Sequence, residues 1–281
     1  MRERLDPSWR DMHVVVPHGF EAYARIFHPV TRDRPADTGT WHGHLRAGEL
    51  GLEEEQITWT EVAKVFHTVM HPLAQYHRLA AKERNEYGEL IDVLGWRYLD
   101  PDQGTLDHAV LAAVAGHLVE HTATPDSGIA GIWEGNGRWN ASVGYARLSE
   151  YPGGPANELP DLPLIRPRPA PVPMLELPDR NHALCQAGAR TFTDPGWATD
   201  APWGRDDHAE SPSLLWPDDK AWVLVTEVDY DSTIIAGSLQ LITDLVRDPA
   251  IEALIIREGS DLSWDADNEN RPPDPTRAAD Q

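Results

Sequence analysis

The chain has 281 residues and carries 24 lysines and arginines against 46 aspartates and glutamates, which gives a formal net charge of −22. This length can bury a substantial core, and a hydrophobic content of 41% is typical of globular proteins. The negative charge argues against nucleic-acid binding and against docking on an anionic membrane. It favours solubility and the attraction of a cation or a basic protein.

The single cysteine, Cys185, rules out an internal disulfide framework. Residues 1–7 are charged and lead into no apolar run, so a signal peptide is not expected. No apolar stretch reaches the roughly 18–20 residues that a bilayer-spanning helix needs. The sequence therefore predicts a soluble, cytoplasmic protein.

The N-terminal region mixes strand and loop signals. Residues 14–16, all valine, predict a short strand that stops at Pro17. Residues 23–27 are compatible with a second strand or a helical turn. Residues 31–55 are polar and predict a loop-rich segment.

Two stretches carry helix signals. Thr58 and Glu61 match a capping box, and apolar residues at spacings of three and four follow them. Pro72 interrupts this helix, and a second short helix is expected to start there. A longer helix is predicted over about 106–120, because apolar residues recur every fourth position among helix-favouring alanines.

The middle of the chain is rich in turn residues. Residues 128–139 predict a hairpin whose turn lies at 134–137, since Asn136 followed by Gly137 suits the positive φ angles of a tight turn. Prolines crowd residues 151–178 and predict an extended, semi-rigid connection.

The C-terminal region carries the clearest strand signal, at residues 221–228. Further strands are expected at 183–187 and 251–256, and a loop over 194–217. Residues 231–233 offer helix N-caps, so we expect a helix to follow them, with its apolar face extending to Leu245.

These elements predict an α+β fold, with a mostly antiparallel sheet and two or three packed amphipathic helices. The proline-rich segment suggests a division into an N-terminal α+β part, residues 1–150, a linker or crossing loop, residues 151–178, and a C-terminal α+β part, residues 179–258. Residues 259–281 are polar and acidic and predict a disordered tail.

One motif has the spacing of a zinc site. His117, Glu120 and His121 match H-x-x-E-H, in which two histidines on one helical face bind zinc and the glutamate acts as a base. The competing interpretation is structural, because a histidine at the end of a helix complements the helix dipole. The sequence identifies no third ligand.

Other candidate ligands are less specific. His67 and His71 repeat the four-residue spacing but precede a proline, and His42 and His44 flank a glycine in a loop. Glu227, Asp229 and Asp231 alternate along the chain. They could hold Mg²⁺ or Ca²⁺ at a strand end, or they could cap the helix expected to follow.

Nucleophile and phosphate-binding motifs are absent from the sequence, and Cys185 lies in an apolar stretch without an activating charge nearby. Tryptophan is frequent, with 11 residues. Trp133, Trp139 and Trp216 are candidate partner contacts near turns and strands. Trp222 lies inside the clearest strand and is expected in the core.

Several segments resemble a family of uncharacterised acidic actinobacterial proteins of similar length. They are HTATP (121–125), WEGNG (133–137), SPSLLWPDDKAW (211–222), TEVD (226–229) and AGS (236–238). The chain departs from the family at 127–130, where a Cys-Trp-Phe-like stretch is common. The resemblance implies a soluble, intracellular protein and assigns no activity and no residue roles.

The favoured hypothesis is a non-catalytic acidic protein that binds another protein, for example an immunity or inhibitor protein against a basic toxin, without a cofactor. The alternative is a zinc-dependent hydrolase that uses His117, Glu120 and His121. A third hypothesis is a carbohydrate-binding module that uses exposed tryptophans.

Overall fold

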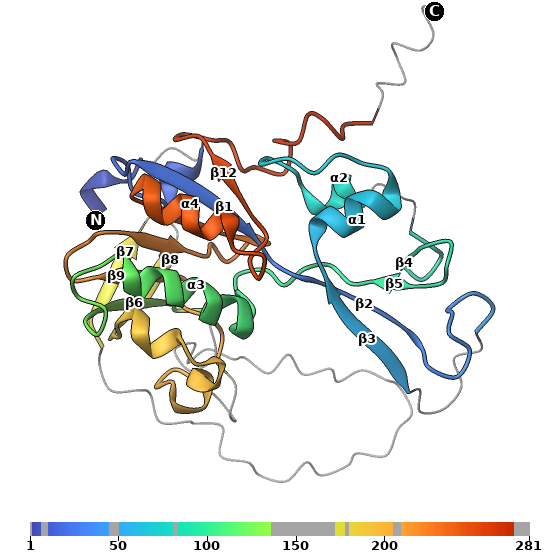
Figure 1. Ribbon diagram of the computed structural model, residues 1–281, viewed down its shortest axis with the longest axis horizontal. Coiled ribbons are helices and arrows are strands. Elements are labelled where there is room, and N and C mark those ends of the chain that lie inside the picture. Colours follow the sequence, from blue (N-terminus) through green and yellow to red (C-terminus); the bar gives the residue numbers. More distant parts are fainter. Residues whose placement is uncertain are drawn as a thin grey trace, which may run out of the picture.

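The computed structural model describes residues 2–6, 11–44, 51–80, 84–135, 172–177, 180–204 and 209–272. They form one sheet of eight strands and one of four, and every strand pair in both sheets is antiparallel. Helices pack against both sheets (Figure 1). The predicted α+β fold with a mostly antiparallel sheet is therefore confirmed.

The large sheet has the strand order β12-β1-β11-β10-β9-β6-β8-β7. Its strands are β1 (Ala22–Phe27), β6 (Gly128–Trp133), β7 (Met174–Leu177), β8 (Arg180–Gln186), β9 (Leu214–Pro217), β10 (Val223–Val225), β11 (Ser232–Gly237) and β12 (Ala253–Ile256). Because β1 lies between β11 and β12, the N-terminal and C-terminal parts expected from the sequence share one sheet. The division at residues 151–178 therefore does not separate two units, and β7 lies within that range.

Helices cover one face of the large sheet (Figure 1). They are α3 (His108–Glu120), α4 (Leu239–Arg247) and the short 3-10 helices η3 (Ala189–Phe192) and η4 (Pro195–Asp200). Trp222 is fully buried in this core, and its indole N–H donates to the Leu118 carbonyl of α3 at 3.0 Å. The expected core position of Trp222 is confirmed.

The N-terminal segment covers the opposite face of the large sheet. Its valines at 14–16 are buried in that second core together with Leu262. The expected strand at 14–16 is wrong, since η2 (Met12–Val14) is a 3-10 turn capped by the Asp11 side chain, which accepts from the His13 N–H. The other short 3-10 turn, η1 (Arg2–Arg4), precedes it.

The small sheet has the order β3-β2-β5-β4. Its strands are β2 (Val30–Pro35), β3 (Leu52–Ile57), β4 (Leu90–Ile91) and β5 (Arg97–Tyr98), so the loop expected over 31–55 is partly wrong. Cross-strand ion pairs of Arg32 with Glu55 and of Arg34 with Glu53 stabilise this register.

Two helices pack on the small sheet, α1 (Trp59–Phe66) and α2 (Tyr76–Leu79). The predicted capping box at Thr58 and Glu61 is present, and α1 ends where His67 adopts a left-handed conformation with φ of 58°. The second helix begins four residues later than Pro72, at Tyr76.

The helix expected after residues 231–233 is present with its apolar face extending to Leu245, but its predicted start is wrong. These residues begin β11, whose six residues are all buried, and α4 starts only after Ser238, whose hydroxyl accepts from the Leu241 N–H. A strand buried on both faces is apolar throughout, so periodicity alone does not distinguish it from a helix.

The predicted hairpin at 128–139 is also wrong, because β6, its expected first strand, pairs with other strands on both of its edges. Both edges of β6 are occupied, one by β8 and the other by β9. Residues 136–139 lie outside the described part of the chain, as do residues 151–171 of the proline-rich segment.

The first half of the expected disordered tail is packed against the protein. Leu262 and Ala266 are buried, and the side chain of Asp267 is fully buried. Asp267 accepts from the Gln75 N–H at 3.2 Å and lies 2.9 Å from the His71 Nε2. Residues 259–272 therefore connect the large sheet to the helices of the small sheet, while residues 273–281 lie outside the described part.

Candidate functional site

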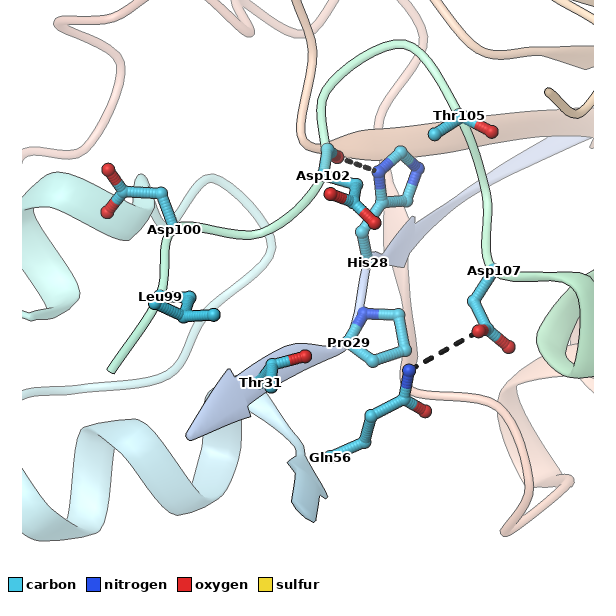
Figure 2. A pocket seen from close by; sticks show the side chains of 9 residues that line it. All are labelled: His28, Pro29, Thr31, Gln56, Leu99, Asp100, Asp102, Thr105 and Asp107. Atoms are coloured by element: carbon cyan, nitrogen blue, oxygen red, sulfur yellow. Dashed lines mark hydrogen bonds between the residues drawn. The ribbon is translucent and has the colours of Figure 1, made fainter. Parts of the chain in front are cut away.

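A small pocket of about 70 Å³ lies where the chain passes from one sheet to the other. His28 and Pro29 join β1 to β2 at this point. The segment between β5 and α3 forms one wall, and Gln56 of β3 contributes to another (Figure 2). The pocket is lined by His28, Pro29, Thr31, Gln56, Leu99, Asp100, Asp102, Thr105 and Asp107.

Three carboxylates give this pocket a negative charge. Asp107 caps α3 and accepts from the Gln56 side chain at 3.3 Å, and Asp100 forms an ion pair with Arg84. Asp102 is exposed and has no cationic partner among the described residues. A basic side chain that entered the pocket would find oxygen acceptors and uncompensated negative charge.

His28 adds no positive charge at neutral pH, since burial lowers the pKa of His28 to about 4. Its Nδ1 lies 2.6 Å from the Asp102 carbonyl oxygen and its Nε2 lies 2.9 Å from the Thr233 hydroxyl. The ring therefore fixes the pocket wall to the large sheet, and it does so in its neutral form.

Gly104 holds the Asp102 segment against the turn between β10 and β11. Its φ is +71°, and a Cβ there would lie 2.8 Å from the Val228 carbonyl oxygen. We expect Gly104→Ala to lower the free energy of unfolding by about 1–3 kcal/mol, through backbone strain and this clash. Urea denaturation measures the loss.

Gly39→Ala is the matched control, since Gly39 has a φ of +67° and no atom within 4 Å of its Cβ position. This variant introduces backbone strain without a clash, so it should lower the free energy of unfolding less than Gly104→Ala does. Equal losses in the two variants would show that the contact with Val228 contributes nothing.

β3 forms one edge of the small sheet, next to the pocket. Residues 52–56 of this strand are all exposed, and they include Glu53, Glu54 and Glu55. The strand pairs with β2 on one side and, in the described part of the chain, with no strand on the other. An edge of this kind leaves backbone N–H and C=O groups available to another chain.

Each histidine of the H-x-x-E-H motif contacts a different aspartate. The His117 Nε2 lies 2.8 Å from Asp248 Oδ2, and the His121 Nε2 lies 3.1 Å from Asp244 Oδ2, both across to α4. Glu120 is exposed. Among the described residues, no third potential metal ligand lies close enough to both histidines to complete a metal site.

The three alternating carboxylates lie in the connection between β10 and β11. Glu227 and Asp229 both pair with Arg180, and Asp231 pairs with the buried Arg25. Burial raises the pKa of Glu227, and Arg180 opposes that shift. These carboxylates thus form ion pairs, and they neither converge on a cation nor cap a helix.

The other candidate histidines have separate partners. The His42 Nε2 lies 2.8 Å from the Asp92 carbonyl oxygen, His44 lies near Asp37, and His71 contacts Asp267. His67 is exposed at the end of α1.

The candidate tryptophans are not a set of exposed rings. Trp133 and Trp216 are partly buried on the large sheet, with the Trp133 ring 6.0 Å from the Arg180 guanidinium carbon. Trp139 lies outside the described residues. Cys185 is partly buried on β8, and burial raises the pKa of its thiol, which disfavours the nucleophilic thiolate.

One group of metal-type ligands does converge within the described part. It consists of His13, His18 and Glu258, whose ligand atoms all lie within 4.8 Å of one another. The sequence analysis does not single out these residues, because Glu258 lies 240 positions after His18. The pocket residues were missed for the same reason, since only the fold brings β1, β3 and the segment after β5 together.

The comparisons with known proteins give no match: no family model, no curated protein and no solved structure is similar to this chain. Across the described residues, no helix combines the length and apolar composition that crossing a bilayer requires.

Proposed function

We propose that the protein binds a basic protein partner, and that the pocket at Asp102 receives a lysine or arginine side chain of that partner. The observation that carries this proposal is the pocket's charge: its lining includes three carboxylates, of which only Asp100 is paired with an arginine among the described residues, and a neutral histidine. An immunity or inhibitor protein that neutralises a basic toxin is one form of this function.

The edge strand β3 supports a protein rather than a small cation as the partner. Gln56 belongs both to this strand and to the pocket lining, so an extended segment paired along β3 would run past the pocket. Leu99, which is 42% exposed, adds an apolar contact at the rim. The net charge of −22 would accelerate the encounter with a basic partner.

The proposal can be tested with a fluorescently labelled eight-residue peptide in which arginine and threonine alternate. Its affinity for the protein is measured by fluorescence anisotropy. We expect it to bind more tightly than the same peptide with citrulline in place of arginine, and to bind more weakly at high salt. Asp102→Asn should weaken binding by about fivefold, the upper end of what an exposed ion pair contributes.

Glu120→Gln removes the same charge from an exposed position on α3 and should leave the affinity unchanged. The proposal fails if the citrulline peptide binds equally well. It also fails if the two charge-removing variants lose affinity to the same extent.

A further inference from the structure

We propose that His13, His18 and Glu258 form a binding site for a divalent transition metal of the zinc type, which joins the N-terminal segment to the end of β12. The proposal is independent of the pocket at Asp102 and adds a second ligand class to the protein.

Two of the three distances between the ligand atoms are close to those around such an ion, and the third, between the His13 and His18 nitrogens, is at most 4.8 Å. The His18 Nδ1 lies 3.4 Å and the His13 Nε2 lies 3.9 Å from Glu258 Oε1. Zinc binds nitrogen and oxygen ligands at about 2.0–2.2 Å, so ligands of one tetrahedral ion are about 3.3–3.6 Å apart. A contraction of a few tenths of an ångström brings His13 into this range.

The His13 ring is fixed in the tautomer that a metal needs. Its Nδ1 lies 2.8 Å from the Val16 carbonyl oxygen, which can only accept, so Nδ1 carries the proton. The Gly259 N–H donates to Nε2 at 3.1 Å, so the in-plane lone pair lies on that nitrogen and accepts this bond. A bound metal would take over this lone pair, and the bond to Val16 is the usual outer support of a histidine ligand.

The carboxylate is also held in place. Glu258 Oε1 accepts from the Gly19 N–H at 3.2 Å and from the Tyr23 hydroxyl at 3.1 Å. These two donors hold the carboxylate oxygen close to the nitrogens of both histidines.

His18 provides the freedom that closing around an ion requires. The His13 and His18 rings stack with centroids 3.4 Å apart and an interplanar angle of 23°, so their nitrogen lone pairs lie in nearly parallel planes. The His13 side chain is 1% exposed, whereas that of His18 is 48% exposed. We therefore expect His18 to rotate towards the ion while His13 stays in place, and water to complete the coordination.

The position of the site gives binding a measurable consequence. His13 and His18 flank the valines that cover the second face of the large sheet, and Glu258 follows β12 at the edge of that sheet. A metal that binds only the folded protein would raise its thermal midpoint, and the rise would continue as the free metal concentration increases above the dissociation constant.

The test uses untagged full-length protein that has been dialysed against a chelator, with Zn²⁺ titrated by calorimetry and Co²⁺ by visible absorption. We expect one ion per chain, a rise in the thermal midpoint, and a Co²⁺ spectrum of the intense, low-symmetry type. His18→Ala and Glu258→Gln should each weaken binding at least tenfold, because each removes a ligand.

His67→Asn is the control, since His67 is an exposed histidine outside the site and asparagine tolerates its left-handed backbone. It should bind the ion as the unchanged protein does. A Co²⁺ spectrum of the hydrated ion alone would overturn the proposal, and so would equal affinity in the His18→Ala and His67→Asn proteins.

Discussion

Replacing Arg25 by leucine should lower the free energy of unfolding by about 3–5 kcal/mol, which is the cost of leaving a buried charge without its partner. The Arg25 side chain is 2% exposed and that of its ion-pair partner Asp231 is 18% exposed. Burial raises the pKa of Asp231, and Arg25 opposes that shift, so the carboxylate depends on the guanidinium. Urea denaturation at pH 7 measures the loss.

Arg25 also satisfies backbone carbonyl groups between α1 and α2. Its guanidinium donates to the Ala74 carbonyl at 2.8 Å and to the Pro72 carbonyl at 3.3 Å, and its Nε–H donates to the Ser232 hydroxyl at 2.8 Å. The leucine variant leaves these acceptors without their donor, which adds to the cost.

The double variant Arg25→Leu with Asp231→Asn distinguishes charge from packing. Because it also removes the carboxylate charge, it should be more stable than the single variant. If the double variant were as unstable as Arg25→Leu alone, the loss would come from packing and lost hydrogen bonds, and the ion pair would contribute nothing.

The second large effect is acid destabilisation through two buried histidines. Burial lowers the pKa of His28 from 6.5 to about 4, and burial together with Arg180 lowers the pKa of His182 from 6.5 to about 4. Between these values the unfolded chain binds more protons than the folded protein does, so stability falls as the pH drops from 6.5 towards 4. Each histidine should account for about 3 kcal/mol of that fall.

Unfolding free energies measured in urea from pH 7 to pH 4.5 test this, with His28→Gln and His182→Gln as the variants. Each variant should show a shallower decline with falling pH, whatever its stability at pH 7. Parallel curves for the unchanged protein and both variants would show that neither histidine resists protonation.

Local signals made part of this fold predictable. The capping box at Thr58 acts within four residues, and the helix over 106–120 repeats its apolar residues on one face, so both could be identified without tertiary contacts. The strand β3 could not, because its row of glutamates lacks strand alternation and finds its arginine partners only in register with β2.

The candidate sites depend on tertiary contacts to a greater degree. The spacing of His117 and His121 was compatible with a metal site, but each ring contacts an aspartate, one in α4 and one at its C-terminal end, which no local pattern indicates. The group of His13, His18 and Glu258 forms only when the N-terminal segment packs against the segment that follows β12. The only local signal of this group is the pair His13 and His18 near Pro17, and their spacing of five residues does not match a helix.

The place of β1 in the large sheet also bears on how the protein is made. Ala22 of β1 pairs with Gly237 of β11, which lies 237 − 22 = 215 positions later in the chain. The other edge of β1 pairs with β12, which is later still. On the ribosome, β1 therefore emerges long before either of the strands that pair with it has been synthesised. Such distant pairing slows folding and prolongs exposure to aggregation, so synthesis should depend on chaperones that shield the nascent chain.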